Sequence, residues 1–183
     1  QNLQVSQIGR SIYTNKENPN FYKMVRPVNL SDFGTVGNYE YLGSKKELQT
    51  IKKGEIVFSA EGTIGKFCVF IDVDNKTITN IHGITIYREE EDEIESAFLG
   101  LFLGYLRKVG ILDYISVGGQ GGSLAQMYWK NIKIPNFPRV LKENLAKRYY
   151  SGILEIDNEI RVIKLKIDDC INNIIHNKEV NIT

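Results

Sequence analysis

The sequence predicts an α+β protein: a mixed, mostly antiparallel sheet or partial barrel packed with helices, followed by a long C-terminal coiled-coil helix. Three patterns in the 183-residue chain lead to this prediction. Short runs rich in β-branched and aromatic residues alternate with glycines before residue 90. A broad apolar stripe with helical spacing follows, and a narrower stripe repeats over the last part of the chain. We therefore expect a domain over residues 1–138 and a long helix over 139–183.

Four short runs are expected to form strands, because they are rich in Val, Ile, Phe, Tyr and Thr and are separated by turn residues. These runs cover residues 39–42, 55–59, 66–71 and 84–87. A further brief strand is expected at 131–135, where a proline ends it. The first 35 residues show no clear periodicity, so no element is predicted there.

Residues 94–109 are predicted to form a helix that packs into the core. Acidic residues precede it, Arg107 and Lys108 close it, and Gly110 can cap its end. A glycine pair spaced by four residues, Gly100 and Gly104, is expected to allow close packing. A short helix is expected at 123–129, opened by a capping box that Ser123 begins.

The last predicted helix covers residues 141–175. Its isoleucines recur at spacings of three and four, which is the pattern of a coiled coil, and Gly152 is a candidate kink near its start. At 1.5 Å per residue, about 35 residues span roughly 50 Å. A single apolar stripe on so long a helix requires a partner.

Composition and charge fit a soluble globular protein, with 42% hydrophobic and 25% charged residues and a net charge of +1. Six acidic residues lie together between Glu89 and Glu95, which leaves the other faces basic enough to meet a polyanion. The alternative is an ordinary solvated surface. No membrane role is expected, because the most apolar stretch has about half the length that a bilayer requires.

The two cysteines, Cys68 and Cys170, lie far apart and form no CxxC pair. This argues against a disulfide scaffold or a zinc site and favours the reducing cytoplasm. The two histidines show no metal-ligand spacing, and no nucleophile motif or nuclease-type carboxylate spacing is present. We therefore expect no catalytic residue, no metal and no cofactor.

Two glycine-rich segments are candidate DNA contacts. The loop GGQGG at 118–122 is neither a P-loop nor a dinucleotide fingerprint, but free backbone N–H groups there can hold a phosphate. In this loop Gln120 is a candidate for reading an adenine edge. The loop residues expected at DNA are Gln120, Gly121, Gly122, Ser123 and, just after it, Lys130. The alternative is a flexible surface loop.

The second segment joins two predicted strands over residues 59–66. Thr63 and Lys66 are expected to reach a phosphate, and Ser59 or Glu61 a base edge; the alternative is an ordinary hairpin turn.

His82, with its neighbour Asn80, is a further candidate for recognition. The alternative is a structural histidine.

These motifs, taken in order, resemble a known family. Residues 54–65, GEIVFSAEGTIG, are similar to the "G-D-I-hydrophobic…G-x-I-G" segment of target-recognition domains in type I restriction-modification DNA specificity (S) subunits. An apolar helix, a glycine loop, a short helix, an "I-x-I-P" strand and a long helix follow in the order of that family. The resemblance covers nearly the whole chain. One family position departs, because Lys142 stands where a Gln is frequent.

The resemblance implies a DNA target-recognition domain with a spacer helix that pairs with another helix, and base reading by loops. It implies sequence-specific binding of double-stranded DNA for a partner methyltransferase (modification) subunit and a restriction subunit. The C-terminal helix would pair with a second recognition half or form a homodimer. No Asn/Asp-Pro-Pro-aromatic motif is present, so methylation would belong to a partner or to an absent domain.

Three other functions remain open. One is a coiled-coil interaction module without DNA binding. Another is the recognition fragment of a fused methyltransferase-restriction enzyme. A third is a small nuclease or transferase, for which the sequence offers no catalytic constellation.

Overall fold

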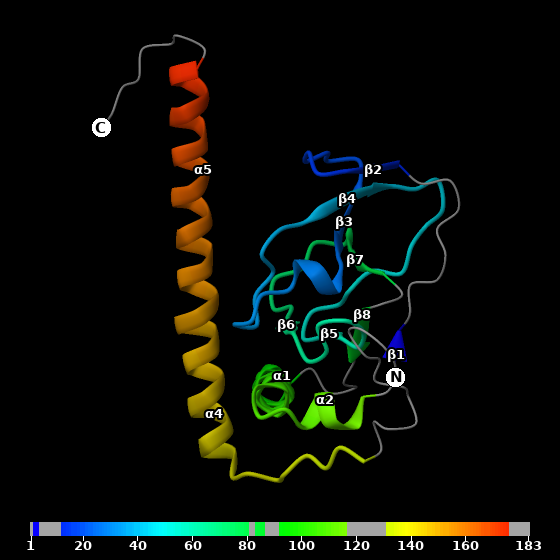
Figure 1. Ribbon diagram of the computed structural model, residues 1–183, viewed down its shortest axis with the longest axis vertical. Coiled ribbons are helices and arrows are strands. Elements are labelled where there is room, and N and C mark those ends of the chain that lie inside the picture. The colour runs from blue at the N-terminus through cyan, green and yellow to red at the C-terminus, as the bar shows by residue number, and fades with distance from the viewer. Residues whose placement is uncertain (1, 4–11, 81–82, 87–91, 117–130, 176–183) are drawn as a thin grey trace. The chain divides into compact units, whose positions relative to one another are not determined.

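The computed structural model describes residues 2–3, 12–80, 83–86, 92–116 and 131–175 (Figure 1). Two small, mostly antiparallel sheets packed with helices precede a long C-terminal helix, which confirms the α+β prediction. The chain divides into two compact units, Gln1–Ala146 and Lys147–Thr183. The expected boundary after residue 138 lies upstream of this division, because the first turns of the C-terminal helix pack within the first unit.

The first sheet is antiparallel throughout, in the order β1-β8-β5-β6. Its strands are β1 (Asn2–Leu3), β8 (Gly83–Ile86), β5 (Ile56–Ser59) and β6 (Phe67–Val69). At the centre, Val57 of β5 is paired with Cys68 on one side and Thr85 on the other. Every residue of β5 is buried, because the sheet is covered on both faces.

The second sheet has the order β2-β4-β3-β7. Its strands are β2 (Ile12–Thr14), β4 (Glu40–Gly43), β3 (Tyr22–Val25) and β7 (Thr77–Thr79). In this sheet β4 runs antiparallel to both β2 and β3, whereas β3 and β7 are parallel, with Met24 paired with Ile78. A short 3₁₀ turn, η1 (Pro27–Asn29), follows β3.

The main core joins the two sheets, and a helix covers the outer face of the first. Val25 of β3 and Val57 of β5 belong to one buried cluster. On the other face, α1 (Glu93–Lys108) packs against β6, and the ring of Phe67 fills the space where Gly100 and Gly104 carry no side chain. The prediction of close packing at this glycine pair is confirmed.

The ends of α1 follow the predicted chemistry. The carboxylate of Asp92 accepts hydrogen bonds from the backbone N–H groups of Ile94 and Glu95 and so caps the helix. Gly110, in the left-handed conformation, ends the turn after α1 and begins a short helix, α2 (Ile111–Ile115), that the periodicity did not predict.

The C-terminal helical segment begins with α4 (Arg139–Arg148), at the expected start of the long helix and two residues before the range that the periodicity indicated. A π-helical turn, η2 (Tyr149–Leu154), contains Gly152 and leads into α5 (Glu155–Ile175). The suspected irregularity at Gly152 is therefore a wide helical turn. None of the helices in the described part of the chain combines the length and apolar character that a membrane-spanning segment requires.

Two expectations require correction. Residues 131–135 do not form a strand: the segment pairs with no strand among the described residues and runs as irregular chain toward α4. The first 35 residues do contain regular elements, since β1, β2, β3 and η1 lie there. The predicted helix at 123–129 lies outside the described residues.

Glu55, just before β5, is a buried carboxyl group whose charge is poorly compensated. Its Oε2 accepts a hydrogen bond of 2.8 Å from the backbone N–H of Lys52, whereas its Oε1 has no partner among the described residues. Burial raises the pKa of Glu55, and the hydrogen bond from Lys52 opposes that rise only in part.

A carboxyl group whose pKa is higher in the folded than in the unfolded chain loses stabilising free energy as the pH rises between the two values. We expect the free energy of unfolding of the wild type to decline over this interval relative to Glu55→Gln, whose amide does not titrate. Urea unfolding from about pH 4 to pH 8 measures both curves. Parallel curves would show that the folded chain leaves this pKa at its ordinary value.

Candidate nucleic-acid interface

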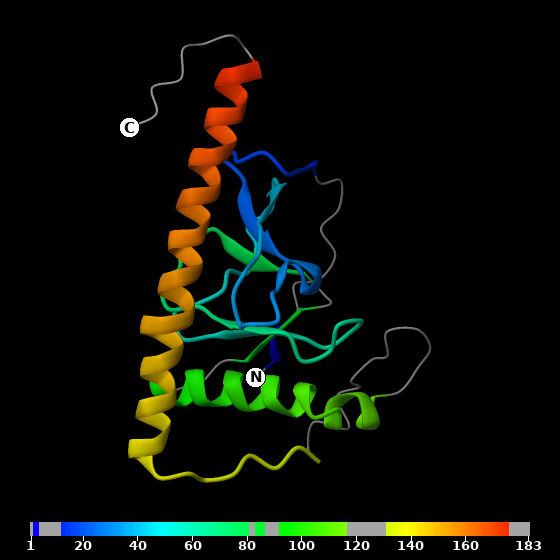
Figure 2. The same ribbon diagram turned by 60° about the vertical axis from the view of Figure 1, so that its left-hand side comes forward.

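The turn between β5 and β6 projects from the end of the first unit at which α2 lies (Figure 2). Several hydrogen bonds close it; among them, the hydroxyl of Ser59 donates to the carbonyl of Glu61 at 3.0 Å, and the N–H of Gly65 donates to the carbonyl of Ser59 at 2.9 Å. Gly62 and Gly65 have φ values of 69° and 91°. Such angles strain any other residue, so the glycines set the shape of this turn. Its tip exposes Glu61, Gly62 and Thr63.

Gly65 also brings the turn into close contact with the helices. A Cβ atom at this position would lie 2.6 Å from Cβ of Arg107 and 2.7 Å from Cδ1 of Leu112. Arg107 is in the last turn of α1, and Leu112 is the buried residue of α2. The absence of a side chain at Gly65 therefore places the turn directly on the corner between the two helices.

Three charged side chains meet beside this turn. Nη1 of Arg107 lies 2.7 Å from Oδ1 of Asp32, and Nζ of Lys66 lies 3.6 Å from the same oxygen. The Lys66 side chain is 17% exposed and that of Asp32 is 58% exposed, so a stem packed on the protein meets a carboxylate open to solvent. Two cations from different elements thus converge on one anion. We call Asp32, Lys66 and Arg107 the charge cluster.

The loop that carries Asp32 is held by its own hydrogen bonds. Oγ of Ser31 accepts from the N–H groups of Phe33 and Thr35, at 3.0 and 3.2 Å, and lies 2.8 Å from Oγ1 of Thr35. Such local bonds fix the direction of the loop and therefore the position of Asp32.

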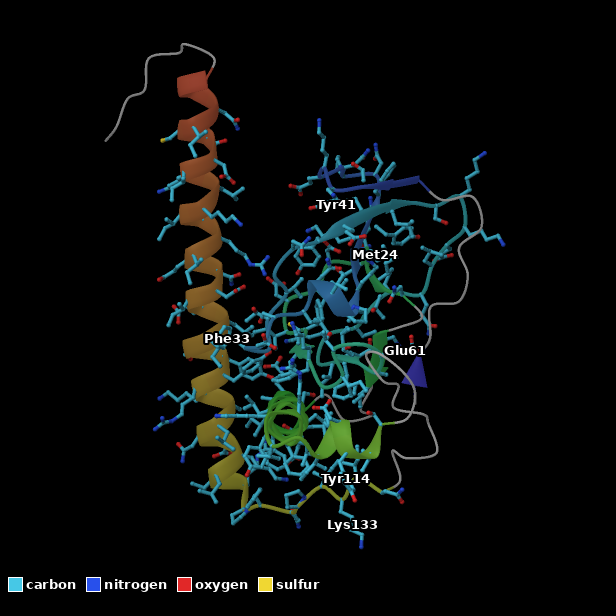
Figure 3. The ribbon with its side chains drawn as sticks, in the orientation of Figure 1. Met24, Phe33, Tyr41, Glu61, Tyr114 and Lys133 are labelled. Carbon is cyan, nitrogen blue, oxygen red and sulfur yellow. The ribbon has the colours of Figure 1, made fainter. Side chains whose placement is uncertain are left out.

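Two aromatic side chains, one in the loop of Asp32 and one in α2, are exposed. Phe33, directly after Asp32, is 73% exposed, and Tyr114, two residues after Leu112, is 91% exposed (Figure 3). Exposed aromatic rings on a surface that also carries cations favour contact with sugars and bases.

The structure brings together part of the predicted site. Glu61 and Thr63 lie exposed at the tip of the turn, as a contact role requires, and Lys66 lies in the charge cluster. Ser59 is fully buried and bonds within the turn, so it shapes the turn and does not face a ligand. Asn80 is half-buried, and its carbonyl accepts from the N–H of Gly83, which is paired with Ser59.

The remaining predicted contacts lie outside the described residues. They are His82, Gln120, Gly121, Gly122, Ser123 and Lys130. Asp32 and Arg107 were missed as site residues. Arg107 reads as an ordinary C-terminal helix charge, and Asp32 lies where the sequence shows no periodicity. No three His, Cys, Asp or Glu side chains in the described ranges come together as metal ligands.

A second charged group, at the other end of α1, joins this helix to α4. The guanidinium of Arg139 hydrogen-bonds to Asp92 and holds the pKa of that carboxyl below its usual range. Nζ of Lys142 lies 2.7 Å from Oε1 of Glu95 and 5.0 Å from the ring centroid of Phe98. Because these side chains pair with one another inside the first unit, we interpret the group as an anchor for α4.

The comparison of the chain with protein-family models gave no match, and the comparison with curated proteins gave none either.

Proposed function

We propose that the chain is a sequence-specific double-stranded DNA-binding module, the specificity component of a restriction-modification system. In this proposal the first unit reads DNA, and the C-terminal helix pairs with a second recognition half. A methyltransferase subunit and a restriction subunit, bound as partners in the cytoplasm, perform the chemistry.

The observation that carries this proposal is the convergence of Lys66 and Arg107 beside an exposed, glycine-shaped turn. A phosphate can take the place of the Asp32 carboxylate between the two cations, since phosphate and carboxylate both present anionic oxygens that accept hydrogen bonds from Lys and Arg. The tip of the turn, with Glu61 and Thr63, then lies next to the DNA backbone, where side chains can reach base edges. Asp32 competes with the phosphate and limits binding to any sequence.

Two substitutions test this arrangement in opposite directions. Lys66→Ala is expected to weaken binding to all duplexes and to lower the salt slope of the binding constant by about one. Asp32→Asn is expected to tighten binding and steepen the slope, because it releases both cations from their internal partner. Titrations of labelled duplex with the full chain, at several salt concentrations, measure both effects.

Lys53→Ala is the matched control. Lys53 also forms an ion pair, at 2.8 Å with Glu93. It lies before β5 in the chain and Lys66 lies after it, so the two lysines are at opposite ends of this strand. Its loss should leave binding unchanged. Equal effects of the two lysine substitutions would indicate general charge attraction and would remove the charge cluster from the interface.

Selection from a random duplex pool tests sequence specificity. An enriched motif is expected, with binding to unrelated duplexes weaker by about a thousandfold or more. The coiled-coil alternative predicts the opposite result: the chain associates through its C-terminal helix but enriches no sequence.

A further inference from the structure

α5 carries an apolar stripe that stays exposed among the described residues of its own unit. Its members recur at spacings of three and four and are about half exposed or more. They are Ile156 (55%), Ile160 (59%), Ile163 (57%), Ile167 (53%) and the exposed Cys170. A stripe this narrow and regular fits a single partner helix, because each residue fills a hole on the facing helix.

We infer that this stripe packs on α5 of a second copy of the chain, in antiparallel orientation, with Ile160 opposite Ile163 of the second copy. In this register Ile156 faces Ile167 of the second copy. The inference names the partner of the pairing helix in the proposed function. It rests on that function for the pairing role alone and does not depend on DNA binding.

The charges beside the stripe select this arrangement. Glu159 and Lys166 lie on one flank of the stripe, and Asp157 and Lys164 lie on the other. In an antiparallel pair each flank faces the same flank of the partner helix. With Ile160 opposite Ile163, Glu159 faces Lys166 of the second copy and Asp157 faces Lys164. Each pairing occurs twice, so all the flanking charges are matched.

Other arrangements lose this match. Shifting the antiparallel pair by one heptad places either Glu159 opposite Glu159 or Lys166 opposite Lys166. A parallel pair matches Glu159 with Lys164 but leaves Lys166 opposite Ile171. Like charges face each other in the shifted pairs, and in the parallel pair a lysine loses its partner. Charge complementarity therefore favours one register and one orientation.

The two flanks of the stripe differ in how their charges are already paired within one helix. Asp157 already forms an ion pair of 2.8 Å with Arg161, one turn along the same helix. Glu159 and Lys166 both have exposed side chains. Substitutions at Glu159 and Lys166 therefore report on the contact between the two helices, because they disturb the ion pairs within each helix the least.

The register is tested by charge exchange in the full chain. Glu159→Lys alone and Lys166→Glu alone should each weaken dimerisation at least about tenfold, because two attractive contacts become repulsive. An equimolar mixture of the two variants should recover the wild-type dissociation constant, since each lysine then faces a glutamate. Glu155→Lys, the same reversal at a position that points away from the stripe, should have little effect. Sedimentation equilibrium measures all four samples.

A mixture no tighter than its components would overturn this register. Circular dichroism of each variant separates a lost contact from a lost helix.

The orientation is tested with cysteines in a Cys170→Ser chain. Ile156→Cys alone and Ile167→Cys alone should give no disulfide-linked dimer after mild oxidation, because neither position faces itself. A mixture of the two should give one, because position 156 faces position 167. Efficient cross-linking within either single variant would indicate a parallel pair and overturn the inference.

Both tests are made without DNA, so their failure can be distinguished from failure of the proposed function. A wild-type chain that stays monomeric at the highest soluble concentration overturns the pairing and leaves duplex binding to be judged separately. A dimer with the expected charge and cysteine behaviour that enriches no DNA sequence supports the pairing and removes the proposed function.

Discussion

Gly65→Ala is expected to destabilise the folded protein by about 3 kcal/mol or more. The new methyl group would lie 2.6 Å from Cβ of Arg107 and 2.7 Å from Cδ1 of Leu112, so the turn and the corner between α1 and α2 must separate. Overpacking of this kind costs about 1–3 kcal/mol. The φ of 91° adds roughly 1–2 kcal/mol of backbone strain for a residue with a side chain. Urea denaturation followed by circular dichroism measures the loss.

Gly62→Ala separates the two contributions. Gly62 lies in the same turn and also has a positive φ, of 69°, but a Cβ atom there meets nothing within 4 Å. We therefore expect this variant to lose only the strain, about 1 kcal/mol. If the two alanine variants were equally stable, the turn would not be packed on the helices, and the position of the charge cluster would have to be reconsidered.

Lys142→Ala is expected to cost about 2–3 kcal/mol. Its ammonium group pairs with Glu95 where the two side chains are only 10% and 18% exposed, and its stem lies on the ring of Phe98. Removing one member of a poorly solvated pair leaves the other charge without its main partner. Arg139, 3.8 Å from the same carboxylate, limits the loss.

The double variant Lys142→Ala/Glu95→Ala tests this explanation. It should be more stable than the sum of the two single losses predicts, because the unpaired carboxylate is gone. Glu143→Ala is the control, since Glu143 is half exposed and forms only a surface pair with Arg139. Its effect should stay within about 0.5 kcal/mol. Additive losses in the double variant would show that Lys142 stabilises by packing alone.

The helices α1 and α5 and the strand β5 could be predicted because each contains its own pattern. α1 and α5 have apolar residues at helical spacing over four or more turns, and Asp92 and Gly110 mark the ends of α1 with familiar capping chemistry. β5 is short, but its first three residues are apolar, so the burial of Ile56, Val57 and Phe58 could be expected from the sequence.

The second sheet could not be predicted in the same way. β2 and β3 are short and carry polar residues, and their pairing depends on distant segments. β3 is parallel to β7, about fifty residues further along the chain, and no local signal encodes that contact. The expected strand at 131–135 failed for the converse reason. Its pattern suits a strand, but no neighbouring strand is available to it among the described residues.

The candidate site also has one part that local sequence patterns predict and one part that depends on distant contacts. The turn at 59–66 was predicted because its glycines are adjacent in the chain and their need for positive φ is a local property. The charge cluster was not predicted, because Asp32 and Arg107 are separated by 75 positions and meet only through the fold. The burial of Ser59 was also invisible, since a serine in a glycine-rich turn is usually exposed.

Under the proposed function, the order of charges along α5 has a consequence for the DNA target. Of the charges that flank the apolar stripe, the acidic Asp157 and Glu159 precede its midpoint and the basic Lys164 and Lys166 follow it, so an antiparallel copy places opposite charges side by side. Two copies joined in this way are related by a twofold axis perpendicular to the helices. Under the proposed function, two identical reading surfaces related by such an axis would favour a target that is an inverted repeat.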